Sequence, residues 1–195
     1  MGGQIIDASI IPAPRQRMTD EERAVVKKGG IPEAWTAKPA RLAQKDRDAR
    51  WTLKRGRRKK GPDGKLMAEI ATAIFGYKSH IGIDQRHGFI RTGSASELPG
   101  LIDPANNTGR SIWASTAYHS QKNERAILRA GRVSKIHFRR SPGRPLPAQR
   151  QRANAARSKV RSAVEHVFAT QNHRMGLFIR TIGIERARAK IGESE

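Results

Sequence analysis

The sequence predicts an α/β protein with a mixed sheet flanked by helices. Two observations support this class. Short apolar segments typical of strands recur along the chain, and the expected order is strand, hairpin, strand, helix, strand, helix. The 195 residues suffice for one medium-sized domain, which we expect to span residues 1–192. Because only 36% of the residues are hydrophobic and 5% aromatic, we expect a small core with long exposed arms.

The first strand is expected at residues 4–11, an isoleucine-rich run with Asp7 in its middle. Pro12 ends it. Residues 20–60 look irregular or weakly helical and include a basic cluster at 54–60. We therefore interpret residues 12–65 as a long basic insertion or arm and not as part of the core.

The central part of the chain predicts three further strands. Residues 74–84 have strand character, residues 85–88 form a turn, and residues 89–92 form a short strand, which together indicate an antiparallel hairpin. After a polar, turn-rich stretch, residues 111–114 predict the next strand.

The C-terminal part predicts three helices and one strand. A helix is expected at 120–130, ending at a glycine, and a strand at 133–138. Residues 139–147 are expected to form an extended basic linker before a long helix at 146–170. A final basic helix is expected at 180–190. The core stripe of the long helix repeats at helical spacing: Val160, Ala163, Val164, Val167 and Phe168.

The charge of the chain indicates a polyanionic partner. Its net charge is +22, from 39 Lys and Arg against 17 Asp and Glu. No hydrophobic run reaches the roughly 20 residues that span a bilayer, and no secretory signal is visible, so we expect no membrane partner. The chain has no cysteine, which excludes disulfides and thiolate metal sites and fits a cytosolic protein. A soluble nucleic-acid-binding protein is favoured.

Two carboxylates are candidates for chemistry on nucleic-acid phosphates. Residues 125–190 contain only Glu165 and Glu185 as acidic residues, and Glu165 lies on the amphipathic helix. An isolated carboxylate inside a basic surface suits metal-dependent attack on a bound polyanion. Asp7 is costly to bury in mid-strand unless it is paired or metal-bound. Alternatively, Asp7 ends a strand and bonds to a local turn.

Simpler interpretations remain for the other acids and for the histidines. Glu165 can pair with Arg161 four residues earlier as an ordinary helical ion pair. Asp84 is better explained as a turn-forming aspartate. The histidines show no paired metal-ligand spacing, and His166 is either a phosphate contact or a helix-surface residue.

The basic residues near these sites are candidate DNA contacts. Contacts of this kind give affinity without sequence specificity. The candidates are Lys54, Arg55, Arg57, Arg58, Lys59, Lys60, Arg139, Arg140, Lys159, Arg161 and His166.

Several collinear segments resemble bacterial insertion-sequence transposases of the DDE type, in the insertion-sequence-four/five superfamily and closest to the insertion-sequence-five group. The resemblance covers almost the whole chain. The matching segments are residues 6–17 (Ile-Asp-Ala-Ser-Ile-Ile-Pro-Ala-Pro-Arg-Gln-Arg), 45–51 (Lys-Asp-x-Asp-Ala-Arg-Trp), 75–84 (Phe-Gly-Tyr-Lys-Ser-His-Ile-x-Ile-Asp), 113–118 (Trp-Ala-x-x-Ala-Tyr), 157–168 and 180–190.

The resemblance implies an RNase H-like fold and an enzyme that cuts DNA at transposon ends and joins the 3′ hydroxyl to target DNA. It assigns Asp7 and Glu165 as catalytic ligands of Mg²⁺, or of Mn²⁺ in its place, with Arg161 in the arginine position of the glutamate motif. The implied partner is double-stranded DNA in the bacterial cytoplasm, on the nucleoid. Relatives usually act as dimers or larger assemblies, but no residue here shows this.

Three departures from the family lead us to expect a catalytically defective, truncated copy. Ser115 stands where the family has its second aspartate, and a hydroxyl cannot supply that ligand's charge. The stretch 92–98 is shorter than its family counterpart. The N-terminal DNA-binding region of the family is expected to be missing. The alternatives are a non-catalytic basic nucleic-acid-binding protein and a decayed pseudogene product.

Overall fold

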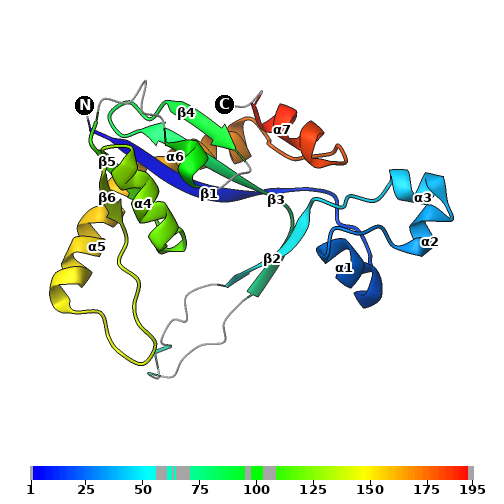
Figure 1. The fold of residues 1–195 in the computed structure, drawn as a ribbon, viewed down its shortest axis with the longest axis horizontal. Helices are drawn as coiled ribbons and strands as arrows, with labels where there is room; N and C mark the ends of the chain where they lie inside the picture. Colours follow the sequence, from blue (N-terminus) through cyan, green and yellow to red (C-terminus); the bar gives the residue numbers. More distant parts are fainter. Residues whose placement is uncertain are drawn as a thin grey trace. The chain divides into compact units, whose positions relative to one another are not determined.

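The computed structural model of the protein describes residues 2–55, 61–62, 64, 71–94, 98–102 and 109–192. Within them, six strands form one sheet in the order β2-β3-β1-β5-β6, with β4 also paired to β3 (Figure 1). The strands are β1 (Gln4–Pro12), β2 (Arg50–Arg55), β3 (Ala71–Asp84), β4 (Ile90–Ser94), β5 (Ser111–Ala114) and β6 (Val133–Ile136). None of the described helices is long and apolar enough to cross a membrane.

The sheet is mixed, as the sequence predicts. β1 pairs in parallel with β5, and β5 in parallel with β6, while β2 and β4 pair antiparallel with β3. The five predicted strands are confirmed. β2 is an addition, because the sequence predicts residues 50–55 to be part of an irregular arm.

The chain divides into two compact units, and the two long strands β1 and β3 run through both. The first unit contains Met1–Ser9, Lys78–Leu177 and Ile191–Glu195. The second unit contains Ile10–Tyr77 and Phe178–Lys190. Neither unit is one continuous stretch of sequence.

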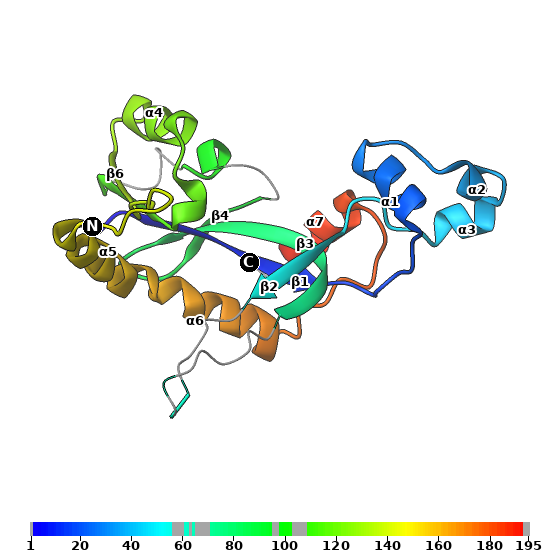
Figure 2. The same ribbon diagram turned by 90° about the horizontal axis from the view of Figure 1, so that it is seen from below.

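The core of the first unit lies on both faces of its strands. Ile5 and Ile6 are neighbours in β1 and point to opposite faces, and both are fully buried. Ile6 packs with Leu98, Ile112 and Ile127, whereas Ile5 packs with apolar residues of β3 and of the helices near the C-terminus. Figure 2 shows α4 (Gln121–Arg129) on one side of these strands, and α5 (Ala148–Arg161) with α6 (Ala163–Ala169) on the other.

The helices of the first unit follow the prediction with one interruption. α4 is capped by the Ser120 hydroxyl and is followed by Gly131 in the left-handed region, at φ 67°. The predicted long helix at 146–170 is divided at Ser162, which ends α5 and begins α6. A π-helical turn, Thr170–Arg174, follows. Residues 139–147, all described, form neither helix nor strand, in agreement with a linker.

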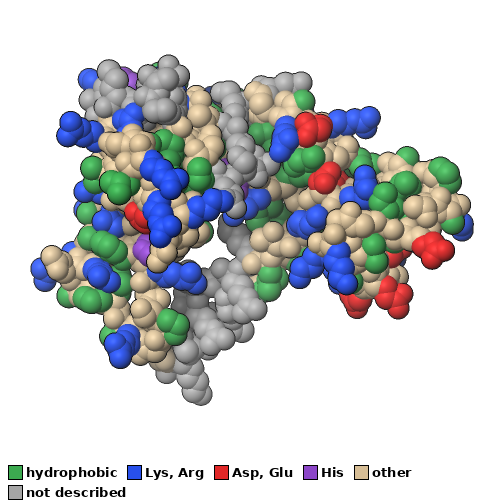
Figure 3. Space-filling view, viewed as in Figure 1, with side chains coloured by type: hydrophobic (Ala, Val, Ile, Leu, Met, Phe, Trp, Pro, Cys, Tyr) green, Lys and Arg blue, Asp and Glu red, His purple; other side chains and the backbone are tan. Residues whose placement is uncertain are grey.

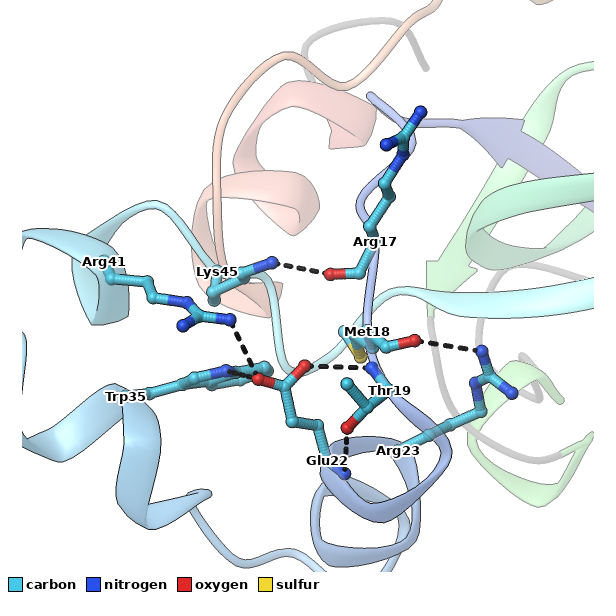
Figure 4. Close-up of polar contacts among 8 residues, drawn as sticks. All are labelled: Arg17, Met18, Thr19, Glu22, Arg23, Trp35, Arg41 and Lys45. Carbon is cyan, nitrogen blue, oxygen red and sulfur yellow. Dashed lines mark hydrogen bonds and ion pairs between the residues drawn. The ribbon is translucent and has the colours of Figure 1, made fainter.

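The second unit contains three short helices where the sequence predicts irregular or weakly helical structure: α1 (Asp20–Lys27), α2 (Glu33–Thr36) and α3 (Pro39–Ala43). α1 begins with a capping box, in which the Thr19 hydroxyl accepts from the Glu22 amide and the Glu22 carboxylate accepts from the Thr19 amide. The Glu22 carboxylate also accepts from Trp35 Nε1 at 2.6 Å and from Arg41 at 3.0 Å (Figure 4).

This network is the buried centre of the three helices. Trp35 is 0% exposed, and the Lys45 ammonium lies 5.5 Å from its ring centroid. Burial opposes the charge on Glu22, but the hydrogen bonds from Thr19 and Trp35 and the charges of Arg41 and Lys45 outweigh it and lower the pKa of this carboxyl.

Two aspartates of the resemblance segment 45–51 have structural contacts in the second unit. The buried Asp46 carboxylate accepts from the amides of Asp48 and Ala49 at 2.9 Å each, and from the Tyr77 hydroxyl. The Asp48 carboxylate accepts from the amide of Ile184 at 2.9 Å, at the start of α7 (Ile184–Gly192). α7 begins four residues later than the helix predicted at 180–190.

Candidate functional site

Asp7 lies in the middle of β1 and is 8% exposed. Its Oδ2 atom is 2.5 Å from Arg161 Nη2, at the end of α5, and its Oδ1 atom accepts from the amide of Ala8 at 2.9 Å. A buried carboxylate needs a compensating charge. Arg161 provides that charge here. Because Asp7 lies inside β1, the strand-end interpretation is wrong, and the assignment of Asp7 as a metal ligand stays a prediction.

Ser115 follows β5 directly, as Asp7 follows the last residue of β1 that pairs with β5. The parallel register pairs Ile6 with Ala114, so Asp7 and Ser115 are each the next residue beyond the last pair, and continuation of this register would bring them opposite each other. Paired strands are about 4.8 Å apart. Trp113, two residues before Ser115, packs against the cluster that contains Ile5, so both strands present these residues to the face that α5 and α6 cover.

Glu165 lies in the first turn of α6, one helical turn after Arg161. The predicted ion pair between these two residues is wrong, because Arg161 contacts Asp7. The Glu165 side chain is exposed, and its carboxylate makes no hydrogen bond or ion pair with any described residue. Val164, the residue directly before Glu165, is fully buried in the same cluster as Ile5. This packing anchors the first turn of α6 to the sheet.

Asp84, at the end of β3, has the turn-forming role that the sequence favours. Its Oδ1 atom accepts from the amides of Arg86 and His87, at 2.9 and 2.8 Å. The carboxylate therefore closes the turn between β3 and β4.

The charge of Asp7 affects the pKa values of two histidines and a tyrosine: His80, His137 and Tyr118. His80 Nδ1 is 2.6 Å from the Tyr118 hydroxyl. Burial, and then the charge of Lys78, lower the pKa of His80 to about 4, although Asp7 opposes this change. Burial raises the pKa of Tyr118, with a smaller contribution from Asp7. Burial, Arg161 and Arg157 lower the pKa of His137.

The described residues around Asp7 do not fit a site for two divalent cations. Asp7 is already neutralised by Arg161, and Ser115 brings no charge. In the described part of the chain, no group of three or more His, Asp or Glu is arranged to hold a metal ion. Two-cation sites need several carboxylates that converge on both ions.

Apart from Arg161, which contacts Asp7, the candidate DNA contacts fall into three groups. Arg139, Arg140, Lys159 and His166 are exposed in the first unit. Lys54 and Arg55 belong to β2 in the second unit. The remaining candidates, Arg57, Arg58, Lys59 and Lys60, lie outside the described residues.

The α5 region is a basic surface of the first unit. Every charged residue of α5 is basic, and Figure 3 shows Lys and Arg side chains gathered around α4 and α5. The inner side of α5 is fixed to the end of β6. There, the side chain of Asn154 exchanges two hydrogen bonds with the backbone of Phe138, and Arg157 lies 4.2 Å from the Phe138 ring centroid.

His80, Tyr118 and His137 are neighbours of Asp7 that the sequence does not reveal. They lie on β3, on the turn after β5 and after β6, so their proximity follows from the strand order. The segment Lys78-Ser79-His80 is part of the resemblance, but no role follows from its residues alone.

The basic residues of α5 provide charges of the kind that contact nucleic-acid phosphates. A family model described as "Transposase DDE domain" matches residues 1–191, and the chain belongs to this family. Its fold is RNase H-like, and the family functions in DNA transposition, binds DNA and generally uses divalent metal ions. The comparisons with curated proteins and with solved structures gave no match.

Proposed function

We propose that this chain is a DDE transposase domain whose catalytic centre comprises Asp7, the Ser115 position and Glu165, and that it has lost DNA strand cleavage and transfer. The observation that carries the proposal is the parallel pairing of Ile6 with Ala114, the residues directly before Asp7 and Ser115, together with the contact between Asp7 and Arg161, one helical turn before Glu165. An aspartate at position 115 would lie beside Asp7.

The predicted defect follows from charge. Two carboxylates on neighbouring strands would together attract a divalent cation, and Arg161 alone would not neutralise both. With Ser115, the single charge of Asp7 is balanced by Arg161 at 2.5 Å. The exposed Glu165 is then the remaining acidic ligand with no partner among the described residues.

DNA binding is the part of the activity that we expect to persist. The substrate would be double-stranded DNA in the bacterial cytoplasm, with Mg²⁺ or Mn²⁺ as the cation of the ancestral reaction. Assembly into dimers, as in the family, would bring two such domains to paired DNA ends.

A nicking assay on supercoiled plasmid with Mg²⁺ or Mn²⁺ tests the proposal. We expect no nicking by the unaltered chain and recovery of nicking by Ser115→Asp. Thr116→Asp is the matched control, because it adds the same charge at the next, exposed residue. The recovered activity should disappear again in Ser115→Asp/Glu165→Gln. Nicking by the unaltered chain would show that the defect is absent, and failure of Ser115→Asp would contradict this catalytic centre.

A second candidate function is a non-catalytic DNA-binding protein. It is favoured by the neutralised Asp7 and by the wholly basic charge of α5. It predicts DNA binding that weakens with salt but does not change with Mg²⁺ or with Glu165→Gln. A filter-binding or anisotropy titration with and without Mg²⁺ separates it from the first candidate.

A further inference from the structure

The turn between β3 and β4 presents an aromatic ring to solvent. Phe89 is 63% exposed, more than any other described aromatic side chain. A single exposed apolar residue is common on protein surfaces and identifies no site by itself. The backbone that holds this ring and the side chains around it decide whether it has a partner.

The backbone of this turn is fixed by hydrogen bonds. The Asp84 amide donates to the Phe89 carbonyl, and the Gly88 amide donates to the Asp84 carbonyl, at 2.9 Å each. Gly88 is in the left-handed region at φ 72°. The Gln85 amide donates to the Gly3 carbonyl at 2.9 Å, which ties the turn to the residue before β1. The Phe89 ring is therefore preorganised, and contact with a ligand would cost little ordering of the backbone.

Two neighbouring side chains flank the Phe89 ring. The His87 ring is stacked on it, with 6.0 Å between the ring centroids and 23° between the planes. The guanidinium carbon of Arg91 lies 5.9 Å from the Phe89 centroid. His87 and Arg91 are themselves exposed. Phenyl, imidazole and guanidinium groups all stack on nucleobases, so these three side chains form a surface for a flat ligand, which we call the turn platform.

The charge around the turn platform is positive. Arg86 and Arg91 are exposed, and neither forms a hydrogen bond or an ion pair through its side chain with a described residue. The acid nearest in sequence, Asp84, is buried, and its Oδ1 atom accepts from the amides of Arg86 and His87. Two uncompensated cations beside a flat ring favour a ligand with both a negative charge and a flat ring. A nucleotide has both, whereas an anionic lipid surface offers the charge alone.

We propose that the turn platform binds an unpaired base of the DNA, with Phe89 stacked on the base and with Arg86 and Arg91 beside the adjacent phosphates. Inside a duplex both faces of a base are covered by its neighbours, so a protein ring can stack only on a base that is extruded, single-stranded or at an end. The inference rests on the proposed function for the identity of the nucleic acid, because DNA ends are what a transposase domain acts on. Since every base has a π face, we expect no preference among bases.

Two matched duplexes test the stacking. One is fully paired, and the other has the same sequence with one extra, unpaired 2-aminopurine, whose fluorescence falls when the base stacks on another ring. We expect the full chain to quench this fluorescence. Phe89→Ala should abolish the quenching and weaken binding to the bulged duplex by about 5- to 150-fold, because one stacked base is worth about 1–3 kcal/mol. Its affinity for the paired duplex should not change, which also shows that the variant is folded.

Three further variants separate stacking from apolar contact and from charge. Phe89→Tyr keeps a ring and should keep the quenching, whereas Phe89→Leu keeps an apolar side chain without a ring and should lose it. Arg86→Gln should keep the quenching at saturation but reduce the slope of log affinity against log salt by about 0.9, the value for one phosphate. Leu128→Ala is the matched control, because it truncates an exposed apolar residue of α4, and it should change neither affinity.

Several results would overturn the turn platform. They are unchanged fluorescence with the full chain, an equal effect of Phe89→Ala on both duplexes, and quenching that Phe89→Leu retains. Binding to phosphatidylserine vesicles that requires Phe89, with no effect of Phe89→Ala on the bulged duplex, would assign the ring to a lipid surface instead.

A failure of the proposed function gives a different pattern, because neither binding measurement requires cleavage. If Ser115→Asp does not nick plasmid but Phe89→Ala weakens binding to the bulged duplex alone, the catalytic centre is wrong and the turn platform stands. Nicking by Ser115→Asp without any effect of Phe89→Ala would show the reverse. A chain that binds neither duplex would contradict both proposals.

Discussion

Asp7 and Arg161 form the ion pair around which the candidate site is organised. Their side chains are 12% and 17% exposed, so solvent screens this pair only weakly. A substitution that removes the charge of one residue leaves the charge of the other poorly solvated and unpaired, whereas substitution of both residues leaves no unpaired charge.

We predict that Asp7→Asn lowers the free energy of unfolding by about 1–3 kcal/mol, because Arg161 would then remain unpaired. Urea unfolding measures the change. In a double-mutant cycle, Asp7→Asn/Arg161→Met should be less destabilised than the sum of the two single variants. Strictly additive effects would contradict an energetically coupled pair.

His80 should make stability depend on pH. Its pKa is about 4 in the folded protein, against 6.5 for a free histidine. Between these values the unfolded chain binds more protons, so the free energy of unfolding falls as pH falls from about 6.5 to about 4, by at most about 1.4 kcal/mol per pH unit. Urea unfolding at several pH values should show this slope, and His80→Gln should flatten it. An NMR titration of His80 with a midpoint near 6.5 would contradict the prediction.

At the scale of elements, the stability of α1 depends on the Glu22 carboxylate. It accepts hydrogen bonds from the Thr19 amide, the Trp35 indole and the Arg41 guanidinium. Replacing Glu22 with alanine removes half of the capping box and leaves the buried Trp35 Nε1–H without its acceptor. We predict a loss of about 2–4 kcal/mol, measured by urea unfolding. Glu21→Ala is the matched control, because Glu21 is the neighbouring, exposed acid of the same helix, and it should change stability by less than about 0.5 kcal/mol. Equal losses in the two variants would contradict the role of the network.

The strands were predictable because their signal is local. β1 and β3 are isoleucine-rich runs, and β5 and β6 are short apolar segments between turns. β2 was not predictable because its sequence, Arg-Trp-Thr-Leu-Lys-Arg, is largely polar and becomes a strand by pairing with β3. α2 and α3 have four and five residues, too few for helical periodicity to show.

The site was predictable only in part for a similar reason. The scarcity of acids in residues 125–190 identifies Glu165 as a candidate, and the position of Asp7 within an isoleucine-rich strand identifies Asp7. Helical spacing favours an ion pair between Arg161 and Glu165. In the folded chain, however, Arg161 contacts Asp7, which is 154 positions away in the sequence. The bond between His80 and Tyr118 joins residues 38 positions apart and leaves no trace in a local pattern.

At the scale of the whole molecule, the net charge of +22 should dominate DNA affinity. We predict that Arg139→Gln/Arg140→Gln, in the exposed linker before α5, weakens duplex binding at low salt and that the difference narrows as salt increases. Fluorescence anisotropy from 50 to 300 mM salt, roughly the range in which phosphate contacts are screened, measures it. Arg23→Gln is the control, because Arg23 pairs with Asp20 at 2.5 Å in α1. An equal effect of both changes would contradict a contact by the linker.

The pairing of β1 has a consequence for how the protein is made. Gln4 of β1 pairs with Ile112 of β5, and a ribosome adds about 5–20 residues per second. β1 therefore waits on the order of 5–20 s for this neighbour, and until then Ile6 lacks the Ile112 side chain with which it packs. The sheet cannot be completed while the first half of the chain is emerging, so the nascent protein passes through a stage in which one edge of β1 is unpaired and open to pairing with other chains.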